Sequence, residues 1–152
     1  MIAAGRLSDP PKWEEVRNLP YLDAVIKEAM RIFPVAQWGQ DRVVPHGGAT
    51  IDGKYLPQGT VVGCHADSIH RNQDLFGPDA DDFRPQRWIK ASEQQRAHME
   101  RAMLGFGAGK RMCLGSHIAW LEMKKLVPLL VMHLDVRFVA PSYVVQLPAD
   151  RA

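Results

Sequence analysis

The sequence predicts a mainly helical protein with a small β-sheet, an α+β fold class. Apolar residues in the segment 20–34 recur at steps of three and four, which is the period of one face of an α-helix. A second segment, 118–130, shows the same period. Between them lie short β-prone runs and the pair Asp52-Gly53, which suits a tight turn between antiparallel strands. Two long helices flanking a small antiparallel sheet are the simplest arrangement of these segments.

The first helices are predicted from their start signals and their period. Ser8-Asp9-Pro10-Pro11 places capping residues before prolines and predicts a short helix from Lys12 to about Asn18. Pro20 starts a longer helix, which ends at Pro34 because a proline disfavours the helical conformation of the residue before it. The apolar stripe of this helix comprises Leu22, Val25, Ile26, Ala29, Met30 and Phe33.

A change of period after this helix predicts β-structure. Arg42–Val44 is a short strand candidate, Thr50–Leu56 has the pattern of a hairpin, and Thr60–His65 is a further β-rich run. We expect these strands to form one small sheet that the preceding helix partly covers.

The second half of the chain alternates between helices and turns. A short helix is predicted near Ile69, and a polar surface helix from Ala91 to about Leu104. Four glycines in the eleven residues from Gly105 to Gly115 predict a constrained loop. The second long helix follows and contains Pro128, which should kink it or remove one hydrogen bond. The segment 133–138 alternates weakly and favours a strand.

Composition narrows the function classes. The chain has 152 residues, of which 46% are hydrophobic and 24% charged, as in a single globular domain. A net charge of +2 gives no concentrated basic field, so we expect no nucleic-acid partner. Two cysteines, Cys64 and Cys113, exclude a disulfide scaffold. We see neither a signal-peptide pattern nor an apolar run of about 18 residues, so we expect no membrane span in this chain.

The glycine-rich loop contains the residues that indicate a chemical function. It delivers Cys113 to the start of a helix, where backbone amides and the helix dipole favour a thiolate. Glycines allow the backbone to approach a large flat group closely. Arg111 adds a permanent cation suited to a carboxylate. A thiolate, a flat approach surface and a carboxylate partner together indicate a haem site with an axial cysteine.

The segment Phe106–Gly115 resembles the haem-binding signature of the cytochrome P-450 family, F-G-x-G-x-R-x-C-x-G, at every fixed position. Glu28-Ala29-Met30-Arg31 is similar to the Glu-x-x-Arg motif of the family's K helix. Phe83–Trp88 resembles the family segment F-x-P-E-R-F/W, with Gln86 where glutamate is usual. The resemblance runs from about residue 19 to residue 138 and is closer to eukaryotic microsomal members.

The resemblance implies a role for each matched residue. Cys113 would be the proximal thiolate ligand of the haem iron, and Arg111 and Arg42 would meet the haem propionates. The other haem contacts would be Phe106 beside the sulfur, Gly107, Gly109 and Gly115 in the loop, and Ala119 against the porphyrin. A buried structural charge network would consist of Glu28, Arg31 and Arg87.

The resemblance also implies that residues 1–152 are the C-terminal part of one haem-binding monooxygenase domain, with its K helix, small sheet, haem loop and L helix. The N-terminal two-thirds, with the catalytic acid and alcohol that activate oxygen, would lie outside this chain. The complete enzyme would insert one oxygen atom from O2 into a small organic substrate, using electrons from an NADPH reductase. A full-length protein would be held in the endoplasmic reticulum membrane through an N-terminal anchor that this chain lacks.

Other interpretations of the chain stay open at this stage. It could be a truncated, catalytically inactive haem-binding fragment, or a truncated product without a stable fold. Cys113 could be an inert buried cysteine. It could also be a zinc ligand together with His117, Cys64 and His65, although the paired short spacings of zinc sites are absent.

The charged residues also have simpler interpretations. Periodicity alone places Glu28 and Arg31 away from the apolar stripe, as a solvated surface pair. Arg42 could be an ordinary cation at a strand edge, and His70-Arg71 a capping or surface pair. A cationic face for an acidic electron donor would comprise Lys90, Arg101, Lys110, Lys124 and Lys125, although such runs are usually only solvated.

Overall fold

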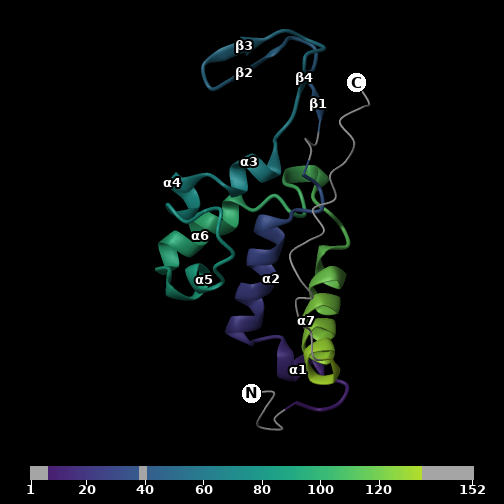
Figure 1. Ribbon diagram of the computed structural model, residues 1–152. Coiled ribbons are helices and arrows are strands. Elements are labelled where there is room, and N and C mark those ends of the chain that lie inside the picture. The colour runs from purple at the N-terminus through teal and green to yellow at the C-terminus, as the bar shows by residue number, and fades with distance from the viewer. Residues whose placement is uncertain (1–6, 38–40, 135–152) are drawn as a thin grey trace, which may run out of the picture.

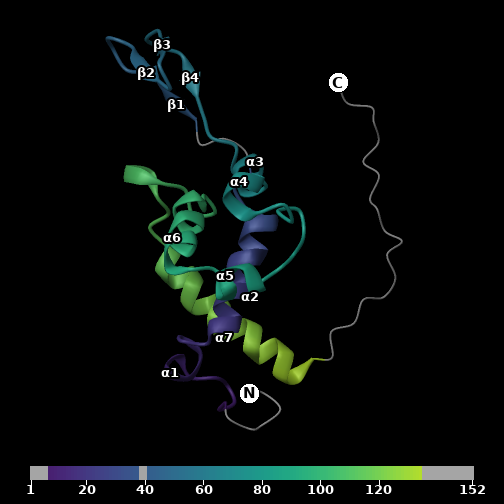
Figure 2. The ribbon, with the colours of Figure 1, turned by 90° about the vertical axis from the view of Figure 1, so that its left-hand side faces the viewer.

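Helix α2 (Pro20–Ile32) lies at the centre of the fold. The computed structural model describes residues 7–37 and 41–134. The short α1 (Trp13–Val16) and the long α7 (Ser116–His133) pack together, and α7 also packs along α2. A group of short helices covers another side of α2, and the strands extend away from the helices (Figures 1 and 2). The predicted mainly helical fold with small β-structure is confirmed.

Helix α2 begins and ends where the prolines predict, with Pro20 in its first turn and Pro34 just beyond Phe33. The predicted apolar stripe is not its most buried face: of the six stripe residues only Ile26 is buried, four are half-buried, and Phe33 is 69% exposed. Ile26 and Ile32 are buried, but so are Ala24, Glu28 and Arg31. Helix α2 is therefore covered on two sides, by α7 and by the short helices.

The predicted single sheet is wrong, because the strands form two separate antiparallel pairs. Strand β1 (Arg42–Val43) pairs with β4 (Val61–Val62), and β2 (Ala49–Ile51) pairs with β3 (Lys54–Leu56). Most of their residues are exposed, so α2 does not cover them, contrary to the expectation. The predicted hairpin turn is present: Asp52 and Gly53 both adopt positive φ, at 49° and 72°, as this tight turn requires.

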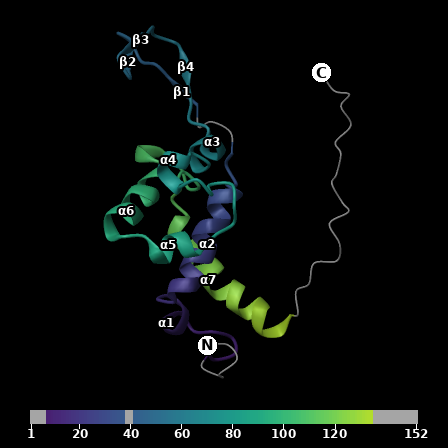
Figure 3. The same ribbon diagram turned by 60° about the vertical axis from the view of Figure 1, so that its left-hand side comes forward.

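Four short helices lie beside α2 (Figure 3). They are α3 (Ala66–His70), α4 (Gln73–Phe76), α5 (Gln86–Lys90) and α6 (Glu93–Ala102). The sequence predicts α3 and α6 but not α4 and α5, because four or five residues are too few to show a helical period. The main apolar cluster lies between these helices and α2 and consists of Ala24, Phe76, Ala80, Trp88 and Met99.

Helix α7 is longer than predicted and continues through Pro128 to His133. Pro128 is its one buried residue among those described, whereas several apolar side chains are exposed: Ile118, Leu121, Leu126, Leu130 and Val131. The strand predicted at 133–138 lies almost wholly outside the described residues. No described helix is long and apolar enough to cross a membrane.

The exposed apolar side chains of α7 should make the isolated chain self-associate, with Leu126 and Leu130, one turn apart, forming the α7 face. Leu126→Lys combined with Leu130→Lys should shift sedimentation toward the monomer, because these side chains are 51% and 41% exposed. The unfolding midpoint should stay unchanged. The control is Ile89→Lys on α5, which is 42% exposed and should leave association as it was. Equal effects of both changes would contradict a role for the α7 face.

Candidate functional site

The glycine-rich loop connects α6 to α7 and folds tightly on itself. The Gly107 amide donates to the Leu104 carbonyl at 2.8 Å. Gly107 and Gly109 adopt positive φ, at 73° and 65°, which side chains disfavour. A single 3₁₀ turn follows over Gly109–Arg111. The two glycines thus allow tight turns within a few residues.

A backbone hydrogen bond closes the loop at the cysteine. The Cys113 amide donates to the Phe106 carbonyl at 2.8 Å, so the two ends of the signature segment are held together. Helix α7 begins three residues later, at Ser116, and the Ala119 amide donates to the Gly115 carbonyl at 2.9 Å. The Cys113 side chain is exposed. Its sulfur is therefore available to a group outside the described chain.

The two predicted propionate-binding arginines come together. Arg42, on β1, and Arg111, at the end of the 3₁₀ turn, line one open hollow with Asp41 and Val43. Arg42 also lines a neighbouring, mostly apolar hollow with Ala36, Cys64, Ala66, Leu104, Gly107 and Ala108.

This donor set fits a haem. Two guanidinium groups suit its two carboxylates, the apolar hollow suits its ring, and an exposed cysteine sulfur suits its iron. The zinc alternative lacks the groups that it needs. In the described residues, no three His, Cys, Asp or Glu side chains gather where they could hold a metal ion.

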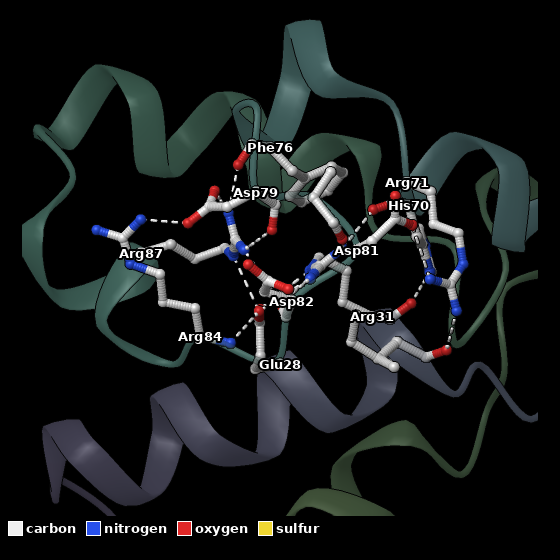
Figure 4. A network of polar contacts seen from close by, with 12 residues as sticks. Glu28, Arg31, His70, Arg71, Phe76, Asp79, Asp81, Asp82, Arg84 and Arg87 are labelled. Atoms are coloured by element: carbon white, nitrogen blue, oxygen red, sulfur yellow. Dashed lines mark hydrogen bonds and ion pairs between the residues drawn. The ribbon is translucent and has the colours of Figure 1, made fainter.

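A buried polar network lies on the side of α2 that faces the short helices (Figure 4). The Glu28 carboxylate is fully buried. It accepts five hydrogen bonds of 2.8–3.0 Å: two from the Arg31 guanidinium, and one each from Arg87 Nε, Trp88 Nε1 and the Arg84 amide. The structure thus brings Glu28, Arg31 and Arg87 into direct contact.

Both arginines also bind backbone carbonyls between the last residue of α3 and the start of α5. Arg31 donates to the carbonyls of His70, at 2.7 Å, and Ala80 and Asp82. Arg87 donates to those of Phe76, Asp79 and Asp82, and its Nη1 contacts the Asp79 carboxylate at 2.9 Å. No buried side-chain nitrogen or oxygen in the described part lacks a partner. The network therefore shapes segment 76–82 as well as neutralising Glu28.

The charge state of Glu28 follows from these contacts. Burial alone would raise its pKa, because a buried carboxylate loses its hydration. The hydrogen bonds from Arg31, the Arg84 amide, Arg87 and Trp88 outweigh burial and hold the pKa of Glu28 below its usual value. The interpretation of Glu28 and Arg31 as a solvated pair is wrong. Periodicity assumes one buried face per helix, and α2 is covered on two.

His70 is the residue that the sequence interpretation missed. Its predicted role in a capping or surface pair is wrong, because its side chain is fully buried. Nδ1 lies 3.1 Å from the Arg31 carbonyl, and Nε2 lies 2.8 Å from the Leu104 amide. Arg71, its neighbour, does form surface ion pairs, with Asp67 and Asp81 at 3.0 Å each. No local pattern distinguishes the two residues.

The predicted cationic face is also incomplete. Lys124 on α7 bonds Asp23 on α2 at 2.8 Å, and its side chain is only 12% exposed. It therefore ties two helices together instead of presenting its charge to a partner.

Known proteins that resemble this chain identify its family. Residues 2–144 match the family model described as cytochrome P-450. The chain belongs to this family. A cytochrome P-450 monooxygenase of Aspergillus terreus is 54% identical over 134 residues, which cover 88% of this chain and 27% of that protein. The monooxygenase mpaDE of Penicillium roqueforti is 48% identical over 132 residues, covering 87% of this chain and 16% of the relative.

A solved structure has the same fold over most of the chain. The retinoic acid-bound cyanobacterial CYP120A1 matches with a TM-score of 0.68 and 32% identity, over 78% of this chain and 27% of that one. The predicted family resemblance is confirmed. The chain spans about a quarter or less of the length of these cytochrome P-450 proteins.

Glu28→Gln should lower the free energy of unfolding by about 3–5 kcal/mol, because two buried cations lose their counter-charge. Urea denaturation followed by circular dichroism measures the change. The matched control is Glu100→Gln, which removes a partly exposed ion pair with Lys27 and should cost below about 1 kcal/mol. Similar losses in both variants would contradict the importance of the buried network.

Acid should destabilise the protein through His70. Burial is the main cause that lowers its pKa, and repulsion from Arg31 adds to it, against the opposing effects of the Arg31 carbonyl and Asp67. The unfolded chain therefore binds a proton at higher pH than the folded chain. The stabilisation is complete above about pH 6.5 and falls as pH drops below it, by up to about 1.4 kcal/mol per unit. Urea denaturation across pH 5–8 should show this slope, and His70→Gln should remove it.

Proposed function

We propose that this chain is the haem-ligating portion of a haem-thiolate monooxygenase, with Cys113 as the axial ligand. The observation that carries the proposal is the loop itself. Gly107 and Gly109 adopt positive φ, the Cys113 amide binds the Phe106 carbonyl, and the cysteine is exposed. Arg111 of the same loop lines an open hollow together with Arg42. Residues 1–152 then form the C-terminal part of one haem-binding domain.

In this proposal each residue of the site has one task. Arg42 and Arg111 bind the propionates, since both guanidinium groups line the same hollow. Gly107, Gly109 and Gly115 keep the loop free of side chains that would hold the ring away. The contacts nearest the sulfur and the porphyrin are made by Phe106 and Ala119. When bound, haem supplies the family's oxygen-activating chemistry.

Several properties of the complete enzyme go with this proposal. It inserts one oxygen atom from O2 into a small organic substrate and receives electrons from an NADPH reductase. Its catalytic acid and alcohol, and an anchor in the endoplasmic reticulum membrane, belong to parts of the protein outside this sequence. Residues 1–152 bind and orient the cofactor, and the proton-delivering groups come from the other part of the domain.

A second candidate function is that of a catalytically inactive haem-binding fragment. The exposed apolar face of α7 and the open hollows around Arg42 favour it, because the cofactor site of this chain has no cover from the described residues. The two candidates differ in substrate turnover. NADPH-dependent oxidation by the 152-residue chain together with a reductase would contradict the inactive fragment, and it would also contradict the placement of the proton-delivering groups outside this chain.

Ligation is tested by spectroscopy of the 152-residue chain with added haem, dithionite and carbon monoxide. A red-shifted Soret band is the signature of a thiolate–carbonyl complex. Cys113→Ala should abolish the band. Cys64→Ala is the matched control, because Cys64 is equally a free, exposed cysteine and lines the neighbouring hollow. A folded protein without the band, or a band that survives Cys113→Ala, would contradict the assignment.

A further inference from the structure

One buried side chain connects the polar network to the cysteine loop. His70 ends α3 and lies between α2 and residue 104, where the chain leaves α6 for the glycine-rich loop. Its two ring nitrogens contact the Arg31 carbonyl and the Leu104 amide, at 3.1 and 2.8 Å. The two contacted residues, Arg31 and Leu104, lie 39 and 34 positions away from His70 in the sequence.

We propose that His70 is a positioning residue that holds the start of the cysteine loop against α2 and thereby sets the place of Cys113. The inference deepens the proposed function, since the purpose of the placement rests on Cys113 being the haem ligand. The mechanical part of the proposal, the placement of the loop, does not need haem.

The contacts define a single state of the imidazole. A carbonyl oxygen can only accept, so Nδ1 carries the proton that it donates to Arg31. An amide N–H can only donate, so Nε2 is unprotonated and accepts from Leu104. The neutral Nδ1–H tautomer alone satisfies both partners. The imidazole ring also packs edge-on against Phe76, with ring centroids 6.4 Å apart.

Arg31, the residue of α2 that His70 contacts, is itself held in place by several hydrogen bonds. The Arg31 side chain is fully buried and is bound by the Glu28 carboxylate at 2.9 Å, and it donates back to the His70 carbonyl at 2.7 Å. Arg31 and His70 are therefore joined by two hydrogen bonds in opposite directions. Figure 4 shows the two residues together at one end of the network.

From His70 a continuous set of hydrogen bonds leads to the cysteine. The Leu104 amide binds His70, and the Leu104 carbonyl accepts from the Gly107 amide at 2.8 Å. Phe106 lies in the turn between Leu104 and Gly107, and its carbonyl accepts from the Cys113 amide at 2.8 Å. A shift of Leu104 would therefore move the turn on which Cys113 is held.

Two substitutions test the two hydrogen bonds of His70 one at a time. The amide nitrogen of His70→Asn can take the place of Nδ1 and still donate to Arg31, but the side chain is too short to reach Leu104. The side-chain oxygen of His70→Gln can take the place of Nε2 and still accept from Leu104. The proposal therefore expects the glutamine variant to keep the loop in place and the asparagine variant to release it.

The first readout is amide hydrogen exchange by NMR on the full chain without haem. His70→Asn should speed exchange of the Leu104 amide by about tenfold, the loss expected for one hydrogen bond, and should also speed exchange at Cys113. His70→Gln should leave both near wild type. Unchanged protection in His70→Asn overturns the proposal. Equal unfolding of both variants also overturns it, because His70 would then serve the core and not the loop.

The second readout is the Soret band of the carbonyl complex in the haem-loaded chain. His70→Asn should reduce the thiolate form of the band, and His70→Gln should retain it. If His70→Asn changes exchange at Leu104 but leaves the band intact, the link from His70 to the ligand is wrong. If the wild type gives no thiolate band, the proposed function fails, and the exchange data still decide the role of His70.

Discussion

A negative charge at Glu28, fully removed from water, has to be neutralised by the protein itself. Arg31 from the same helix and Arg87 from α5 do this, and Trp88 and the Arg84 amide complete the shell. The arginines in turn bind carbonyls of segment 76–82, which has little regular structure of its own. Because each partner would be a costly unpaired group without the others, the network specifies one arrangement of the short helices on α2.

The network is also connected to the glycine-rich loop that contains Cys113. The backbone of Arg31 binds His70, and His70 binds Leu104 at the start of the loop. The loop supplies its own shape through Gly107 and Gly109 and the Cys113–Phe106 hydrogen bond. Local backbone geometry therefore determines the form of the loop, whereas the buried network determines where the loop lies relative to α2.

Outside the network, several large apolar side chains of the described residues are exposed. The main apolar cluster lies between α2 and the short helices, while α7 leaves five of its apolar side chains exposed. The site residues Arg42, Arg111 and Cys113 lie on open surface. Groups of exposed apolar side chains often mark a contact with another element. The chain spans about a quarter of the length of the relatives that it matches.

By itself the sequence determined the features that depend on neighbouring residues. The bounds of α2 follow from Pro20 and Pro34, the hairpin turn from Asp52-Gly53, and the family from the loop around Cys113. Only the tertiary structure decided the pairing of the strands into two sheets, the burial of Glu28 and Arg31, and the bridging position of His70. These depend on contacts between residues far apart, such as Glu28 with Arg87, 59 positions away. A helical period reports one apolar face and carries no information about which polar side chains meet across the core.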